Sequence, residues 1–327
     1  MPKRERFSII DVLILLATIL VLTGHHRFLQ EDFSWYIGCG RIIYSFHMGF
    51  FMAISGFLVK YTFSENRSWV SYVGKKAKKF IPAYFTVGLL AALISSKTIG
   101  AFAHNLLMLV VSPVLGPIQI IWYIYVLFMF YCLAPFIFRL SLKWRYLLLV
   151  LSFVPAAFFF SITPYFCLNH FFRQLPFFLL GTLIADNFKK VQAISDSKLL
   201  MAGFPFIAFV IGCIFYNDNP MPEREGLGKI ITTFMALPLM YWIGKKLMRI
   251  GFVTKISTSF SPYVYSVYLW QMFFIEGLWM LWQRTNIQLN DGTAVIYLFC
   301  SVAFTILGIV LMMKSWRWLS VKIRKPE

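Results

Sequence analysis

Apolar segments about as long as a bilayer is thick recur along this chain of 327 residues. Runs such as Ile9–Leu22, Tyr146–Phe160 and Ala294–Met313 are bounded by polar or basic residues. A helix needs about 20 mostly apolar residues to cross the hydrocarbon core, and it satisfies its own backbone hydrogen bonds there. These runs therefore predict membrane-spanning helices.

The composition agrees with an apolar solvent. Hydrophobic residues make up 59% of the chain and charged residues only 13%, with a mean hydropathy of +0.72. A soluble domain has about 25% charged residues. So few charges do not cover a water-facing surface of this size, and a bilayer supplies the apolar surroundings that the chain needs.

The hydropathy pattern predicts an all-α membrane protein, a bundle of about ten transmembrane helices. Residues 1–327 form one membrane domain in this interpretation, because no segment is polar enough for a separate soluble domain. Residues 97–118 are expected to form an outer loop with a re-entrant or interfacial helix. The ten predicted helices cover residues 8–24, 42–59, 80–96, 119–138, 146–162, 174–188, 199–216, 229–244, 259–282 and 293–313.

The distribution of basic residues predicts the orientation. The net charge is +18, which in a soluble protein would suggest a nucleic-acid partner. Here 24 of the 31 basic residues fall in the termini and the connections on one side of the predicted bundle, and 7 fall on the other side. The positive-inside rule places the richer side in the cytoplasm. We expect a multi-pass protein of the cell membrane with cytoplasmic termini, lipid contacts and no nucleic-acid partner.

The first predicted helix carries a polar stripe. Asp11, Thr18 and His25 are spaced seven residues apart, so they lie on nearly the same face over roughly 21 Å. His25 is followed by His26. Neutral imidazole accepts and returns a proton near working pH, but His25 also fits an interfacial histidine beside water. Asp11 fits a functional role and, equally well, an acid that the helix dipole favours in the first turn.

The second predicted helix combines small and polar residues. Gly49, Ala53 and Gly56 form a stripe that allows another helix to approach closely. His47 and Ser55 place polar groups in apolar surroundings, where each needs a partner.

Two further regions contain candidate site residues. The basic segment Lys75–Tyr84 is suited to anionic lipid head groups or to the phosphates of a cytoplasmic donor. Gln271 and Glu276 lie in the ninth predicted helix about 140° apart, on different faces. Glu276 is expected to pair, to stay neutral or to line water.

Several segments together resemble one family. The runs Asp11–His25, Phe46–Leu58 and Lys78–Tyr84, followed by Ile121–Tyr125, Phe178–Gly181 and Ser266–Gln271, appear in the order found in the acyltransferase 3 family of integral membrane acyltransferases. The chain looks most like its fucose 4-O-acetylase-like branch. The resemblance implies about ten helices and transfer of an acyl group, usually acetyl from acetyl-CoA, to a hydroxyl of a surface carbohydrate.

The resemblance also implies roles for individual residues. The family's first-helix histidine, treated there as catalytic, corresponds to His25, and the donor side corresponds to Lys78–Tyr84. The chain departs from the family pattern at Ile14, where an arginine is frequent, and at Gln271, where a histidine is frequent. An acid frequent after the fourth-helix tryptophan is also missing beyond Trp122.

These considerations predict an O-acetyltransferase that uses acetyl-CoA and no metal, with a cell-surface or exported polysaccharide as acceptor. His25 is the general base or a covalent acyl carrier. A transporter or flippase for a glycan or a lipid-linked solute, and an inactive family member, are the alternatives. The predicted catalytic residues are His25, Asp11 and His47; the substrate-binding residues are His26, Thr18, Ser55, Trp122, Gln271 and Glu276; and the donor-binding residues are Lys75, Lys76, Lys78, Lys79 and Tyr84.

Overall fold

The chain is helical throughout the part described by the computed structural model. The described residues are 8–26, 28–63, 68–158, 163–195, 197–217, 222–285 and 287–323, and no strand occurs among them. The prediction of an all-α fold is therefore confirmed. The helices form two compact units, which we call the terminal unit (Arg6–His47 with Ile243–Glu327) and the central unit (Met48–Trp242).

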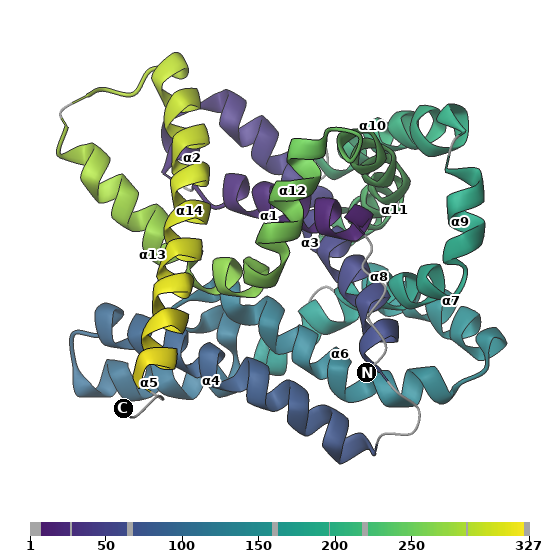
Figure 1. Cartoon of the computed structure of the whole chain (residues 1–327), viewed down its shortest axis with the longest axis horizontal. Helices are drawn as coiled ribbons and strands as arrows, with labels where there is room; N and C mark the ends of the chain where they lie inside the picture. The colour runs from purple at the N-terminus through teal and green to yellow at the C-terminus, as the bar shows by residue number, and fades with distance from the viewer. Residues whose placement is uncertain are drawn as a thin grey trace. The chain divides into compact units, whose positions relative to one another are not determined.

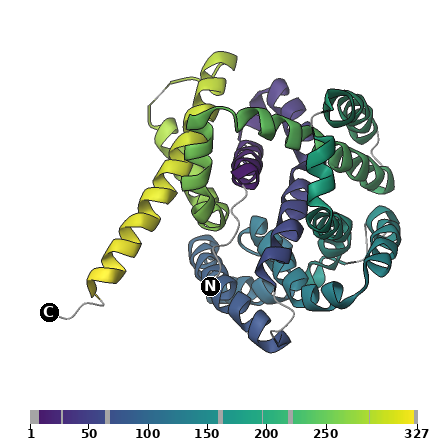
Figure 2. The same ribbon diagram turned by 45° about the vertical axis from the view of Figure 1, so that its right-hand side comes forward.

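The terminal unit is assembled from both ends of the chain. Within it, α1 packs against α12 and α13, and α13 packs against α14. Figure 1 shows α13 and α14 as neighbouring helices, and in Figure 2 the yellow α14 runs well past the end of α13. The helices of this unit are α1 (Ser8–Gly24), α2 (Leu29–Asp32), the first part of α3 (Ser34–Thr62), α12 (Gly251–Phe260), α13 (Val264–Gln283) and α14 (Asp291–Ile323).

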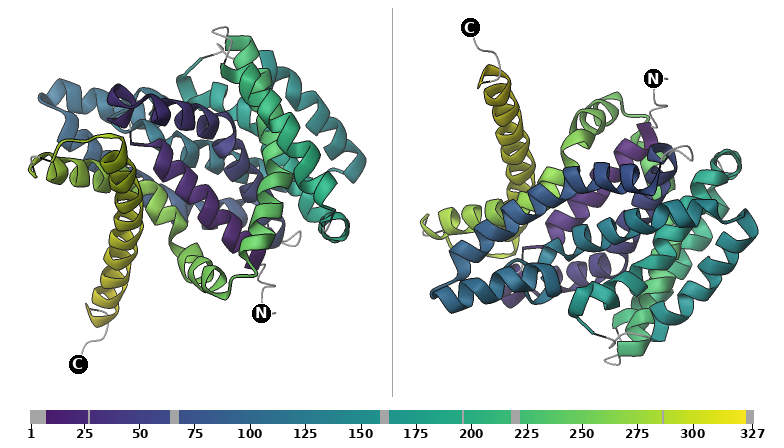
Figure 3. Two further views of the ribbon diagram at one scale, coloured as in Figure 1. Left: turned by 90° about the horizontal axis from the view of Figure 1, so that it is seen from above. Right: turned by 90° about the horizontal axis from the view of Figure 1, so that it is seen from below.

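The central unit holds the remaining helices. Here α4 packs against α5 and α6, while α8 packs against α6 and α7; α4 and α6 run alongside each other in Figure 3. The helices are the rest of α3, then α4 (Trp69–Ser95), α5 (Ile99–Val111), α6 (Trp122–Arg139), α7 (Leu142–Phe158), α8 (Leu168–Asp186), α9 (Phe188–Ile194), α10 (Phe204–Asn217) and α11 (Pro222–Leu247).

Each of the ten predicted segments is mostly helical where it is described, although 80–96 ends one residue beyond α4 and 174–188 crosses the break between α8 and α9. Four helical segments of the described chain are long and apolar enough to cross a membrane, or five if the bent pair Phe188–Ile194 and Leu199–Ile214 is one span. The apolar helices α1 and α5 are shorter. The membrane character is thus supported, while the predicted ten spans and cytoplasmic termini stay predictions. The long spans are Ser34–Thr62, Trp69–Ser95, Gln119–Arg139 and Asp291–Leu319.

Small residues bring α3 and α8 into backbone contact within the central unit. A Cβ added at Gly56 would overlap the carbonyl oxygen of Phe178, and one added at Gly181 would overlap that of Ala53. A Cβ at Gly49 would lie 2.9 Å from the ring of Phe177. The predicted packing role of the small-residue stripe is confirmed, because only hydrogen fits at these positions.

Gly56→Ala should therefore destabilise the protein. Alanine favours a helix over glycine by about 1 kcal/mol, but forcing α3 from α8 costs about 1–3 kcal/mol, so we expect a lower midpoint of thermal unfolding in detergent. Gly74→Ala in α4 is the control, because an added Cβ meets nothing within 4 Å there. Equal midpoints for the two variants would contradict the close contact.

Candidate active site

The polar stripe of α1 is buried in the terminal unit. Asp11, Thr18 and His25 are only 7%, 3% and 8% exposed, respectively. The Thr18 hydroxyl donates to the carbonyl of Ile14 at 2.8 Å, so it is satisfied within its own helix. The stripe thus leads through buried surroundings to the end of α1, where His25 follows Gly24.

Side chains satisfy the last carbonyls of α1. His26 Nδ1 lies 2.9 Å from the carbonyl of Leu22, the hydroxyl of Tyr36 donates to Thr23 at 2.6 Å, and that of Tyr44 donates to Gly24 at 2.7 Å. The final carbonyls of a helix lack intrahelical partners, and leaving them unpaired in apolar surroundings costs several kcal/mol each. These three bonds fix the backbone on either side of His25.

The contacts of His26 define its protonation state. A carbonyl only accepts, so Nδ1 carries the proton that it shares with Leu22. Nε2 then accepts from the hydroxyl of Ser301 in α14, at 2.8 Å. Burial, followed by the neighbouring His25, lowers the pKa of His26 to about 4 despite the hydrogen bonds to the backbone. His26 is therefore a neutral link between the end of α1 and α14.

Aromatic rings enclose this link. His26 meets Phe28 edge-on with ring centroids 5.6 Å apart, and Phe28 stacks on Trp279 of α13 at 4.0 Å. Tyr297 of α14 meets Phe28 at 5.6 Å and Trp279 at 5.8 Å. The rings pack on one another, so this side of His26 belongs to the core.

His47 lies near the same end of α1 through Tyr44. Its ring meets that of Tyr44 edge-on at 5.1 Å, and Nδ1 lies 2.7 Å from the carbonyl of Ile43. The same reasoning places the proton of neutral His47 on Nδ1. Tyr44 thus contacts the imidazole of His47 and caps Gly24, the residue before His25. A neutral imidazole at such a site is able to accept a proton.

The other predicted substrate residues are divided between the two units. In the central unit, the hydroxyl of Ser55 bonds to Phe51 at 3.0 Å and to the hydroxyl of Tyr123 at 2.8 Å, while Trp122 packs on His170 with ring centroids 4.3 Å apart. In α13 of the terminal unit, Gln271 is fully buried and Glu276 is exposed, as expected for different faces.

Gln271 retains one unused acceptor. Its Nε2 donates to the carbonyl of Tyr268 at 2.9 Å, whereas its buried Oε1 has no hydrogen-bond partner among the described residues. A buried polar atom of this kind needs a partner or costs about 1–3 kcal/mol. Gln271 therefore remains suited to a polar ligand.

The predicted donor segment belongs to α4 of the central unit. Lys75, Lys78 and Lys79 are exposed, whereas Lys76 is partly buried. Lys76 Nζ lies 4.1 Å from the ring centroid of Tyr131 and donates to Thr62 at 3.3 Å. The Tyr84 hydroxyl is used within the protein, donating to the carbonyl of Leu109 at 2.7 Å.

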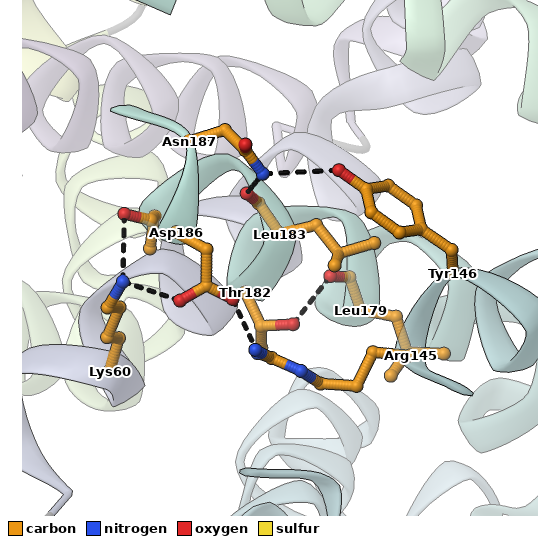
Figure 4. Close-up of polar contacts among 9 residues, drawn as sticks. Lys60, Arg145, Tyr146, Leu179, Thr182, Leu183, Asp186 and Asn187 are labelled. Carbon is orange, nitrogen blue, oxygen red and sulfur yellow. Dashed lines mark hydrogen bonds and ion pairs between the residues drawn. The ribbon is translucent and has the colours of Figure 1, made fainter. Parts of the chain in front are cut away.

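A charged cluster that the sequence did not predict joins three helix ends of the central unit. Asp186, at the end of α8, contacts Lys60 of α3 at 2.5 Å and Arg145 of α7 at 2.6 Å. Figure 4 shows both cations turned toward this carboxylate. Asp at a helix C-terminus and Arg at an N-terminus each oppose the helix dipole, and their pairing offsets that cost.

Residues missed from sequence include Tyr36, Tyr44 and Ser301, which hold the end of α1. Ser301 offered a signal, since a hydroxyl in the apolar run Ala294–Met313 needs a partner. The two tyrosines offered none, because aromatic residues make up 19% of the chain. Among the described residues, no group of three His, Cys, Asp or Glu side chains is placed to hold a metal ion.

Comparison with known proteins gives one match. The family model described as an acyltransferase domain matches residues 7–314, which is nearly the whole chain and includes the described parts of both units. No curated protein and no solved structure matches the chain.

Removing the carboxylate of Asp186 should destabilise the central unit. Asp186→Ala leaves Lys60 and Arg145 facing each other without a counter-charge. Breaking a buried ion pair in this way costs about 3–5 kcal/mol; the carboxylate side chain is 17% exposed, so we expect the lower end. The midpoint of thermal unfolding in detergent measures this. The exposed Asp32→Ala variant is the control, and an unchanged midpoint for Asp186→Ala would show that the cluster adds no stability.

Stability should depend on pH through His26. Its pKa in the folded protein, about 4, lies below the ordinary 6.5, so the unfolded chain takes up a proton first as pH falls. The stability present above pH 6.5 is lost progressively down to pH 4, by about 3 kcal/mol in total.

Unfolding midpoints measured from pH 7 to pH 4 test this dependence. His26→Gln should flatten the profile, while His104→Gln, which removes an exposed histidine, should leave it unchanged. A His26→Gln profile as steep as that of the wild type would contradict the assignment.

Proposed function

The chain belongs to the acyltransferase 3 family, and from this membership we propose that this membrane acyltransferase moves an acetyl group from acetyl-CoA to a hydroxyl of a cell-surface or exported polysaccharide. In this proposal residues 1–327 act as one acyltransferase domain of the cell membrane, with both termini in the cytoplasm. Residues 7–314, the matched region, supply the reaction.

One observation carries the proposal. His25 is 8% exposed and follows a helix whose last three carbonyls are held by His26, Tyr36 and Tyr44. A catalytic base gains most from being fixed in a water-poor site near the reacting hydroxyl. His26 is committed to Leu22 and Ser301, so the adjacent His25 is the imidazole that we assign to chemistry.

The reaction then follows ordinary acyl transfer. His25 takes the proton of the acceptor hydroxyl while the hydroxyl oxygen attacks the thioester carbonyl carbon. The carbon–sulfur bond breaks, CoA leaves as a thiolate, and the proton on the imidazole neutralises it. Asp11, Thr18 and His47 shape the path along α1. We propose the general-base form because it needs no acyl-imidazole intermediate.

Binding roles complete the proposal. The basic segment of α4 lies near the phosphates of acetyl-CoA, since clustered lysines attract phosphate. The acceptor is bound by polar and aromatic side chains, for which Ser55, Trp122, Gln271 and Glu276 are the candidates. Ile14, which departs from the family pattern, is buried, and its carbonyl accepts a hydrogen bond from Thr18. In this proposal acetyl-CoA is bound without an arginine at position 14.

His25→Ala should abolish most of the activity. General-base catalysis contributes about 10²–10⁴-fold, so acetyl groups on surface glycans, measured by NMR or mass spectrometry, should fall to near the level of cells without the gene. The comparison uses deletion cells that express the wild type or a variant, with equal protein in the membrane fraction.

His104→Ala is the matched control, because it removes an exposed histidine of the central unit. Wild-type acetylation in His25→Ala would remove the proposed role of His25. Glycans that carry the same acetyl groups with and without the gene would contradict the proposed acceptor class.

A further inference from the structure

The central unit contains an apolar cavity that the proposed reaction does not use. Its volume is about 560 Å³, within the range of about 300–1,000 Å³ that is typical of small-ligand pockets. Side chains of α4, α5 and α6 form most of its lining, which Phe166 and Phe171 complete. Phe85, Val110 and Phe166 in its lining are 42–50% exposed, so the cavity opens to the surface.

The few polar groups in its lining are already engaged. The hydroxyl of Tyr84 donates to the carbonyl of Leu109 at 2.7 Å, and that of Tyr125 donates to the carbonyl of Val110 at 3.1 Å. No histidine, acid, amide or basic residue lines it among the described residues. The cavity therefore offers contact area and no acid–base chemistry, which suits a hydrocarbon chain.

Two lysines of α4 lie about one helical turn before lining residues of this cavity. Lys76 precedes the lining residue Phe80 by four positions, and Lys78 precedes Ile81 by three, so each pair shares a helix face. Lys76 Nζ lies 4.1 Å from the ring centroid of Tyr131, and Phe80 meets the same ring at 5.3 Å. One aromatic ring thus joins Lys76 to the wall of the cavity, while Lys78 is exposed.

We propose that this cavity binds one anionic phospholipid of the bilayer, with an acyl chain between α4, α5 and α6 and its phosphate at Lys76 and Lys78. A hydrocarbon chain gains about 0.8 kcal/mol for each buried CH₂. A lysine near the membrane surface adds about 1 kcal/mol with an anionic lipid. The donor phosphates are then left to Lys75 and Lys79, which lie on the face of α4 away from its cavity-lining residues.

The observations favour a phospholipid over the acyl chain of the donor. A donor chain would have to present its thioester to a base and a hydroxyl, and the cavity lining contains no free group of either kind. The opening beside exposed apolar residues such as Ile81 and Leu133 suits a ligand that enters sideways from the bilayer. The proposal does not depend on the acetyl transfer proposed above.

Native mass spectrometry of the full chain in detergent tests the site with three probes: dioleoyl phosphatidylglycerol, dioleoyl phosphatidylcholine and oleoyl-CoA. We expect one phosphatidylglycerol molecule to bind tightly and phosphatidylcholine to bind more weakly. Val110→Trp, which fills the cavity, should weaken the binding of phosphatidylglycerol by about tenfold or more. Leu107→Trp is the matched control, one turn away on α5, because Leu107 is 55% exposed and lies outside the lining.

Further variants distinguish recognition of the acyl chain from recognition of the head group, and a loss of binding from a loss of folding. The double variant Lys76→Gln and Lys78→Gln should reduce the binding of phosphatidylglycerol to the level of phosphatidylcholine binding. Cys132→Phe fills the cavity from α6 and should repeat the effect of Val110→Trp, with thermal unfolding confirming that each variant is folded. His25→Ala should bind phosphatidylglycerol as the wild type does. A failure of the lipid proposal can therefore be told apart from a failure of the acetylation proposal.

Three results would overturn the proposal. The first is wild-type phosphatidylglycerol binding in both folded, cavity-filling variants. The second is equal binding of the two phospholipids to the wild type, which removes the role of the lysines. In the third, oleoyl-CoA displaces phosphatidylglycerol and is itself weakened by Val110→Trp, which would assign the cavity to the donor chain.

Discussion

The end of α1 shows the constraint on which this structure depends: in apolar surroundings, every backbone carbonyl needs a donor from the protein. A soluble helix leaves its last carbonyls to water. Here Leu22, Thr23 and Gly24 receive theirs from an imidazole and two phenols. Because those donors come from α3 and from the residue after His25, satisfying the backbone also orders the candidate catalytic residue.

The adjacent histidines have different roles for the same reason. His26 has one nitrogen on Leu22 and the other on Ser301, and its burial keeps it neutral. A residue used in this way has no nitrogen left for a substrate. Its neighbour His25 occupies the same end of α1, where Tyr44 and His47 also lie. His26 is thus committed to a structural contact, and the proposed chemistry is assigned to its neighbour His25.

Apolar surroundings also constrain the helix packing and the charged groups of the central unit. Its helices approach closely only where side chains are absent, as at Gly56 and Gly181, because apolar side chains gain little by leaving lipid for a helix interface. Its charges gather at helix ends, where Asp186 holds two cations. A cavity remains where α4, α5 and α6 do not fill the space between them, and it is there that we propose a lipid chain.

Much of the architecture could be predicted from sequence. Hydropathy located the helices, with the end of α1 correct at Gly24, because a run of apolar residues is a local property. Seven-residue spacing identified the buried stripe of Asp11, Thr18 and His25. The stripe of Gly49, Ala53 and Gly56 predicted close packing but not its partner, since small residues accept any complementary surface.

The sequence by itself determined the solvent of this protein, its helices and the faces on which polar groups lie, because these depend on residues a few positions apart. Only the tertiary structure decided that His26 reaches Ser301, that Lys60 and Arg145 share Asp186, and that α4 to α6 enclose a cavity. His26 and Ser301 are 275 positions apart, and Lys60 and Asp186 are 126 positions apart. Such pairs form only after helices have packed, and no local pattern encodes which distant group supplies the missing donor or charge.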